Sequence, residues 1–183
     1  MLSDIDWCEA KYTHTIYIAE IKNTLSSLII SAVALYGWMY HCPQPKYSLG
    51  WVLLVVVGLA SAMFHATLLL FWQYVDELSI FALVLWLVAN TQPPILQWYH
   101  WLCLPVLVLA PFYSRYVLFL LGGSLIVQAL VHRIQLPVRA AILLALGVVV
   151  WLVDINHWLC LHDWWHIFIS FAGFLMIEWI AEG

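Results

Sequence analysis

The sequence predicts an all-α membrane protein built as a bundle of seven transmembrane helices. The chain has 183 residues, 66% of them hydrophobic and only 9% charged, and its mean hydropathy is +0.96, whereas an ordinary soluble domain carries about a quarter charged residues. Its apolar runs are continuous and lack the period-two alternation of barrel strands. Because a membrane-spanning helix takes about 20 residues, seven spans leave no room for a soluble domain. We therefore expect residues 1–183 to form one domain.

Cutting the apolar runs at turn residues and charges places the seven spans at residues 23–40, 47–71, 75–89, 95–113, 116–131, 138–153 and 164–180. A polar, acidic segment, residues 1–22, precedes the first span and lacks the basic start and apolar core of a cleavable signal peptide. Pro43 and Pro45 end the first span, because proline cannot continue a helix. Residues 72–74 divide the second span from the third and are the least marked of the breaks.

The later breaks carry stronger signals. Pro93 and Pro94 precede the fourth span, Ser114 and Arg115 separate it from the fifth, and residues 132–137 separate the fifth from the sixth.

In this seven-span arrangement the six basic residues divide evenly between the two faces of the membrane and set no orientation. Eight of the ten acidic residues, by contrast, fall on the face of the N-terminus. The net charge of −4 offers no basic patch for phosphates, which excludes a nucleic-acid partner. One face is therefore expected to carry a polar site.

Side chains that can do chemistry gather at that face. The second span carries Ser61 and His65 in its final third, Asp76 begins the third span, and His162 and His166 begin the seventh. His162 and His166 are four residues apart and share one face of a helix, so they can coordinate one metal ion. A third imidazole from His65 leaves one position open for water, as at a catalytic zinc. Since ionisable groups inside a bilayer cost roughly 2.5–3.5 kcal/mol each on insertion scales, their convergence predicts a site.

The histidines also have a plainer interpretation, in which each one caps a helix end or bonds to a neighbour. The spacing of two histidines does not decide between these interpretations by itself, but the third histidine and Asp76 at the same depth favour the metal. His157 lies near enough in the sequence to remain an outside candidate.

A second group of candidate ligands lies before the first span. Asp6, Glu9 and Glu20 are closely spaced carboxylates on a non-regular segment, with Trp7 and Lys11 among them. Carboxylates and main-chain carbonyls together suit a hard cation such as calcium. The alternative is a solvated acidic segment, which spacing alone favours because no EF-hand pattern is present.

Several short strings, in this order and at these places in the spans, resemble the alkaline ceramidases, seven-span amidases of the CREST superfamily. The resemblance runs nearly end to end. The strings are DWCE at residues 6–9, YIAEIKNT at residues 17–24, SAMFHATL at residues 61–68, DEL at residues 76–78, WLVD at residues 151–154 and LHDWWH at residues 161–166.

The resemblance implies two metal sites and an activity. The zinc ligands it implies are His65, His162 and His166, with Ser61 and Asp76 beside the metal. The calcium ligands it implies are Asp6, Trp7 through its carbonyl, Glu9, the Lys11 position and Glu20. The family usually has an oxygen-bearing side chain such as Asn where this chain has Lys11, so only the main-chain carbonyl could bind calcium there. Ceramide would be hydrolysed to a sphingoid base and a fatty acid by a monomer in the endoplasmic reticulum or Golgi membrane.

Amide hydrolysis would give zinc, Asp76 and Ser61 distinct catalytic roles. Zinc on three imidazoles lowers the pKa of its water to about 7 and polarises the carbonyl. We expect Asp76 to accept the proton of the water and pass it to the leaving amine, and Ser61 to hydrogen-bond to the oxyanion. Cys8 and Cys160 fall on the same face of the predicted bundle, so we also expect a disulfide between them, which needs an oxidising compartment.

Two alternatives stay open. One is a CREST-type lipid hydrolase that acts on another substrate. The other is a receptor or scaffold without enzymatic activity, in which a fourth protein ligand would close the zinc shell. A channel or transporter is disfavoured, because the span centres show no polar path.

Overall fold

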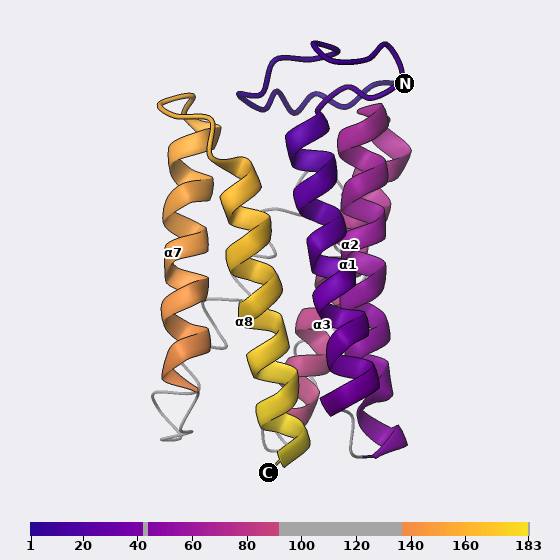
Figure 1. Cartoon of the computed structure of the whole chain (residues 1–183), viewed down its shortest axis with the longest axis vertical. Coiled ribbons are helices and arrows are strands. Elements are labelled where there is room, and N and C mark those ends of the chain that lie inside the picture. The colour runs from indigo at the N-terminus through magenta and orange to yellow at the C-terminus, as the bar shows by residue number, and fades with distance from the viewer. Residues whose placement is uncertain (42–43, 92–136, 183) are drawn as a thin grey trace.

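The computed structural model describes residues 1–41, 44–91 and 137–182, and within them every regular element is a helix (Figure 1). The helices are α1 (Ile21–His41), the short 3-10 helix η1 (Pro45–Tyr47), α2 (Ser48–Thr67), α3 (Leu70–Thr91), α7 (Val138–Ile155) and α8 (His162–Glu182). Four stretches are long and apolar enough to cross a membrane: Pro45–Thr67, Leu70–Thr91, Val138–Ile155 and His162–Glu182. The expected spans at residues 95–113 and 116–131 lie outside the described residues. An all-helical membrane fold is thus observed, and the count of seven spans stays a prediction.

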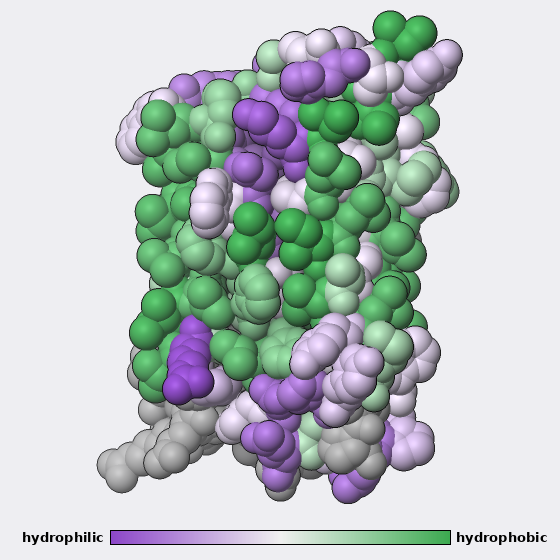
Figure 2. All heavy atoms as spheres, viewed as in Figure 1, coloured by the Kyte–Doolittle hydropathy of each residue, from purple (hydrophilic) through white to green (hydrophobic). Residues whose placement is uncertain are grey.

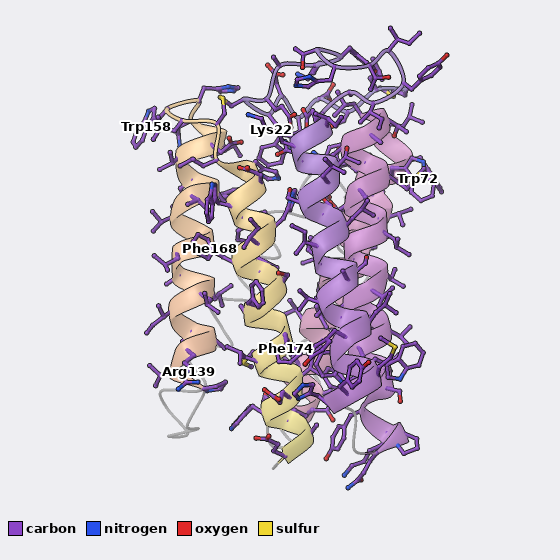
Figure 3. All side chains as sticks on the ribbon, in the orientation of Figure 1. Lys22, Trp72, Arg139, Trp158, Phe168 and Phe174 are labelled. Carbon is purple, nitrogen blue, oxygen red and sulfur yellow. A yellow bond between two sulfur atoms is a disulfide. The ribbon has the colours of Figure 1, made fainter. Side chains whose placement is uncertain are left out.

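The long helices run side by side, and the N-terminal segment lies across one end of them (Figure 1). α1 packs against α2 and α8, α2 also packs against α3, and α8 also packs against α7. Lys22 and Trp158 lie at the end covered by the N-terminal segment, and Arg139 lies at the opposite end (Figure 3). Apolar side chains cover the flanks, and hydrophilic ones gather at the two ends (Figure 2). This distribution is the one expected of helices that cross a bilayer.

Helix α1 occupies the first expected span but is not among the four most apolar stretches. Its low hydropathy comes from five small polar residues, all of them buried against other helices: Asn23, Thr24, Ser26, Ser27 and Ser31. α2 approaches α1 closely at Gly58, where an added Cβ would lie 2.6 Å from the backbone nitrogen of Ser31. Small residues at such contacts let membrane helices pack tightly. The polar face of α1 is therefore turned toward the protein.

The break between α2 and α3 lies at Leu68 and Leu69, before the expected break at residues 72–74. Leu68 adopts a left-handed conformation with φ of 51°, and its N–H group donates to the carbonyl of Phe64 at 2.6 Å. The N-terminal segment stabilises this turn, because the Ser3 N–H group donates to the carbonyl of Leu68 at 2.9 Å. Neither glycine nor proline marks the turn, so the local sequence predicted a longer second span.

Two apolar clusters hold the described part together. The larger one joins α1, α2, α3 and α8 around side chains such as Trp51, Leu54 and Ile177, which are fully buried. The smaller one packs Trp7 of the N-terminal segment onto Phe64 at the end of α2. The N-terminal segment is thus fixed to the bundle at the end where the polar side chains converge.

Candidate metal centre

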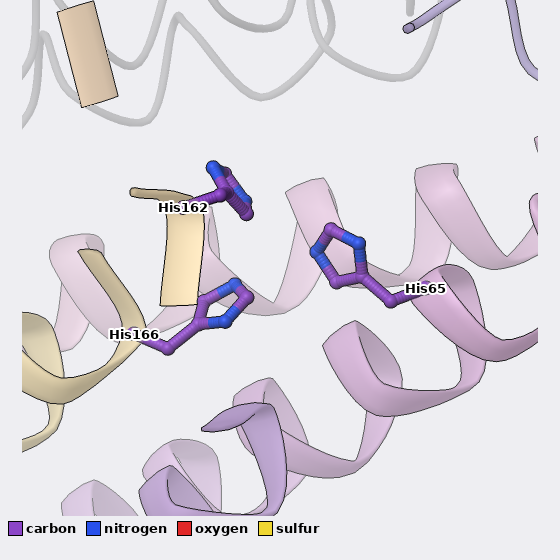
Figure 4. Close-up of side chains that lie close together, drawn as sticks. All are labelled: His65, His162 and His166. Carbon is purple, nitrogen blue, oxygen red and sulfur yellow. The ribbon is translucent and has the colours of Figure 1, made fainter. Parts of the chain in front are cut away.

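Three buried imidazoles meet at the end of the bundle that the N-terminal segment covers (Figure 4). His65 lies in the last turn of α2, and His162 and His166 lie in the first two turns of α8. One nitrogen from each ring lies within 4.8 Å of the other two. The side chains are almost fully buried, with residue exposures of 1%, 4% and 2% respectively. Such a group needs either hydrogen-bond partners or a metal ion to offset its burial.

A buried carboxylate fixes the orientation of His65. Glu20 is fully buried, and its Oε2 atom lies 2.7 Å from Nδ1 of His65. The Asn23 side chain donates to the same oxygen at 3.1 Å. Burial raises the pKa of the Glu20 carboxyl to about 7, and a cation at the imidazoles would favour its ionised form. When Glu20 is ionised it can only accept, and Nδ1 of His65 then carries the proton and leaves the lone pair of Nε2 free.

Serine hydroxyl groups of α1 fix the orientation of His166. Ser26 Oγ lies 2.8 Å from Nδ1 of His166, and Ser27 Oγ lies 3.4 Å from it. Ser26 donates its only hydroxyl proton to the carbonyl of Asn23 at 3.1 Å. In that arrangement it accepts from His166, which places the proton on Nδ1 and leaves the lone pair on Nε2.

The surroundings of His162 differ from those of the other two rings. Its ring stacks on Trp7, with the centroids 3.8 Å apart and the planes at 30°. Nδ1 of His162 is buried without a hydrogen-bond partner, and the nearest carboxylate oxygen, Oδ2 of Asp154, is 3.8 Å away. The N-terminal segment thus holds one face of this ring.

The donor set fits a zinc ion. Two of the three rings present the lone pair of Nε2, and three imidazoles are a common ligand set of catalytic zinc. Tetrahedral zinc with bonds of about 2.1 Å holds its ligand nitrogens about 3.4 Å apart, so ring movements of about an ångström would close the group. Among the described residues, this is the only group of three or more His, Cys, Asp or Glu side chains that lies so close.

Ser61 and Asp76, which the sequence analysis placed beside the metal, are both buried. The hydroxyl oxygens of Ser27 and Ser61 are 3.0 Å apart, and the side chain of Ser61 interacts with the Asp76 carboxyl. Oδ1 of Asp76 is buried without a partner. A line of polar side chains therefore runs from His166 through the two serines to Asp76.

The carboxylates of Asp6, Glu9 and Glu20 do not form a close group of three among the described residues, and the calcium site stays a prediction. Glu9 accepts the N–H groups of Lys22 at 2.8 Å and Asn23 at 2.9 Å, so both its oxygens cap the start of α1. The ammonium group of Lys11 hydrogen-bonds to Asp6 and lowers the pKa of that carboxyl through this bond and its charge. The carboxylates of Glu9 and Asp6 therefore already have partners within the chain.

A disulfide joins Cys8 to Cys160, whose Cα atoms are 5.0 Å apart. It links the N-terminal segment to the loop between α7 and α8. Each half of this link is next to the site, because Trp7 precedes Cys8 and His162 follows two residues after Cys160.

The sequence analysis did not assign the residues that orient the rings. They are Glu20 in its contact with His65 and the two serines of α1 in their contacts with His166. For the serines a signal was present, since Asn23, Ser26 and Ser27 follow the spacing of one helix face in an otherwise apolar span.

Comparison with known proteins gives a family match over nearly the whole chain. A family model described as Ceramidase matches residues 1–182. The alkaline ceramidase of Drosophila melanogaster is 29% identical over 216 aligned positions, which cover 98% of this chain and 76% of that protein. The putative alkaline ceramidase dcd3A of Dictyostelium discoideum is 40% identical over 97 residues, and alkaline ceramidase 3 of Mus musculus is 36% identical over 81 residues. Both of these matches cover 43% of this chain, and they span 34% and 30% of those two proteins.

Proposed function

This chain belongs to the ceramidase family, and from that premise we propose that it is an intramembrane amidase that hydrolyses the N-acyl bond of ceramide to a sphingoid base and a free fatty acid. The observation that supports the proposal most directly is the buried group of three imidazoles, in which two rings have their Nδ1 protons engaged and their Nε2 lone pairs free. A purely hydrogen-bonding role would not need three buried imidazoles at one point.

We propose that His65, His162 and His166 hold a zinc ion. When bound there, zinc would supply a water of pKa about 7 and would polarise the amide carbonyl. No fourth His, Cys, Asp or Glu ligand joins the three rings among the described residues, which leaves a position for water or substrate and supports an enzyme over a scaffold.

Asp76 and Ser61 are the groups of the chain that act on the substrate in this proposal. Hydrolysis adds a hydroxyl group to the acyl carbon, breaks the C–N bond and gives a proton to the amine nitrogen. Asp76 takes the proton of the attacking water and returns it to that nitrogen, which its unpartnered Oδ1 atom is free to do. Ser61 donates to the carbonyl oxygen as charge develops on it.

A cavity beside the site supports access of water to it. The cavity has a volume of about 100 Å³, and Glu9, Asn23, Asp154 and His162 are among its lining residues. This volume is enough for several water molecules. In Figure 2 hydrophilic side chains extend from the covered end of the bundle down between α8 and α1, with apolar surface around them. A lipid with its amide at the membrane surface and its chains in the bilayer would meet the site at this depth.

The acidic N-terminal segment fits calcium poorly in the arrangement described, because its carboxylates are bonded to the chain. Oε1 of Glu20 is the exception, since it is buried without a partner. We propose that the Lys11 ammonium supplies at Asp6 part of the positive charge that calcium would bring. Activity should then depend less on calcium than in a chain with Asn at this position.

We further propose that the protein acts as a monomer in an endomembrane, with the metal centre at the lumenal end. The disulfide between Cys8 and Cys160 supports this orientation, because such bonds form and persist in oxidising compartments.

The test is release of fatty acid from labelled ceramide by the purified protein in detergent, together with its zinc content. We expect H166A to abolish turnover and to lower zinc content, and D76N to abolish turnover while zinc stays bound. H157N serves as the control, because His157 is exposed in the loop before α8 and Asn tolerates its positive φ of 56°. Full turnover in H166A would overturn the metal assignment, and zinc binding without turnover in the native protein would favour the scaffold.

A further inference from the structure

We propose that Asp154 is the positioning residue of His162: its buried carboxylate accepts the Nδ1 proton of that ring and so turns Nε2 toward the metal. The inference rests on the proposed function, because it takes a metal ion at the three imidazoles as given. It assigns a task to a residue that the reaction as proposed above does not use.

The geometry pairs two atoms that lack any other partner. Oδ2 of Asp154 and Nδ1 of His162 are both buried without a hydrogen bond, and they lie 3.8 Å apart. The side-chain exposures are 1% and 5%. This distance is about an ångström longer than a hydrogen bond between these atoms. A turn of the imidazole small enough to bring Nε2 onto a metal ion can also close this gap.

Asp154 is itself held in place by its other oxygen. It lies in the last turn of α7, and its Oδ1 atom accepts the N–H group of Leu161 at 3.0 Å. The backbone N–H groups of His162 and Cys8 also lie close to the carboxylate. The carboxylate is therefore anchored to the start of α8 on one side, with the second oxygen directed at the ring of the first residue of that helix.

The other two rings show why a third acceptor is needed. His65 donates its Nδ1 proton to Glu20, and His166 donates its proton to Ser26. A buried N–H group without an acceptor destabilises the state that contains it, and in the metal-bound state this would weaken metal binding directly. Because the N–H bond of an imidazole lies in the plane of its ring, the acceptor has to lie at the edge of the ring, where Asp154 is found.

A purely structural role for Asp154 is the rival, in which the carboxylate only caps α8 through Leu161. D154N separates the two roles. Its single carbonyl oxygen can still accept from Leu161, but its amide group donates and cannot take the proton of His162. D163N is the matched control, because Asp163 is the neighbouring carboxylate on α8, lines the same cavity and is only partly buried.

The experiment measures the zinc affinity of the purified native protein, D154N and D163N by competition with a chromophoric chelator, and records the visible spectrum of each with cobalt in place of zinc. Loss of a hydrogen-bond partner of a ligating histidine weakens metal binding about 10- to 100-fold. We expect this loss and an altered cobalt spectrum in D154N alone, with the melting temperature of the metal-free protein unchanged.

An affinity of D154N within about threefold of the native value would overturn the inference, since it falls well short of the loss expected for a positioning partner. If D154N does not fold, D154E should restore zinc binding, because it keeps a charged acceptor, and failure of both variants to fold would assign Asp154 to capping. A native protein that binds no zinc would overturn the proposed metal site itself, a result distinct from a loss confined to D154N.

Discussion

The orientation of His166 gives a sharp test of the hydrogen bonding around the metal centre. In S26A the Nδ1 proton of His166 loses its acceptor at 2.8 Å, and the nearest remaining hydroxyl oxygen is that of Ser27 at 3.4 Å. The metal-free ring can move its proton to the other nitrogen, whereas the metal-bound ring cannot. The cost of an unsatisfied buried N–H, about 1–3 kcal/mol, therefore falls on the bound state.

At 1.4 kcal/mol for each factor of ten, S26A should bind zinc about tenfold more weakly than the native protein. S27A should lose less than about threefold, because its contact with the ring is longer and weaker. S31A is the control: Ser31 is buried on the same helix, but its hydroxyl group donates to the carbonyl of Val55 at 2.8 Å. Chelator competition on the three purified variants gives the affinities. Equal losses in all three would refute the orientation argument, because they would indicate a general change in packing.

Three further predictions concern the parts of the chain around the site. C8S, or a reducing agent applied to the native protein, should lower stability by about 2–4 kcal/mol in thermal unfolding, and a reducing agent should have no further effect on C8S. K11N should make ceramide hydrolysis rise with added calcium, and complete loss of native activity in a calcium chelator would contradict the role given to the ammonium group. G58A should lower both the melting temperature and activity, because its Cβ would meet the backbone of α1 at 2.6 Å. G173A should be tolerated, because the nearest atom, 3.1 Å away, belongs to the flexible end of Leu54.

The sequence predicted the helical membrane fold and the pairing of His162 with His166 because both depend on patterns within one segment. Long apolar runs determine the helices, and the i, i+4 spacing puts His162 beside His166. The turn between α2 and α3 was misplaced because Leu68 is not a turn-forming residue. Its left-handed conformation is stabilised by backbone hydrogen bonds from the N-terminal segment, more than sixty residues earlier in the chain.

The hydrogen-bond partners of the imidazoles could not be predicted from the sequence for a related reason. Ser26 and His166 are 140 residues apart, and Glu20 and His65 are 45 apart. Their contacts depend on how helices pack and on where α2 ends, neither of which a local pattern encodes. Glu20 was expected as a calcium ligand because it is one of several carboxylates before the first span, whereas the structure buries it completely beside His65.

The role of the N-terminal segment differs most between the sequence prediction and the structure. It contacts every element that carries a ligand or its partner: Trp7 stacks on His162, Glu20 holds His65, and Glu9 caps the helix that presents Ser26. Its acidic residues Glu9 and Glu20 accept hydrogen bonds within the chain, and calcium binding by the segment stays a prediction. Any change that loosens this segment therefore reaches all three imidazoles through separate contacts, even though the segment itself supplies no zinc ligand. The metal centre is best understood as a site formed between the bundle and this segment.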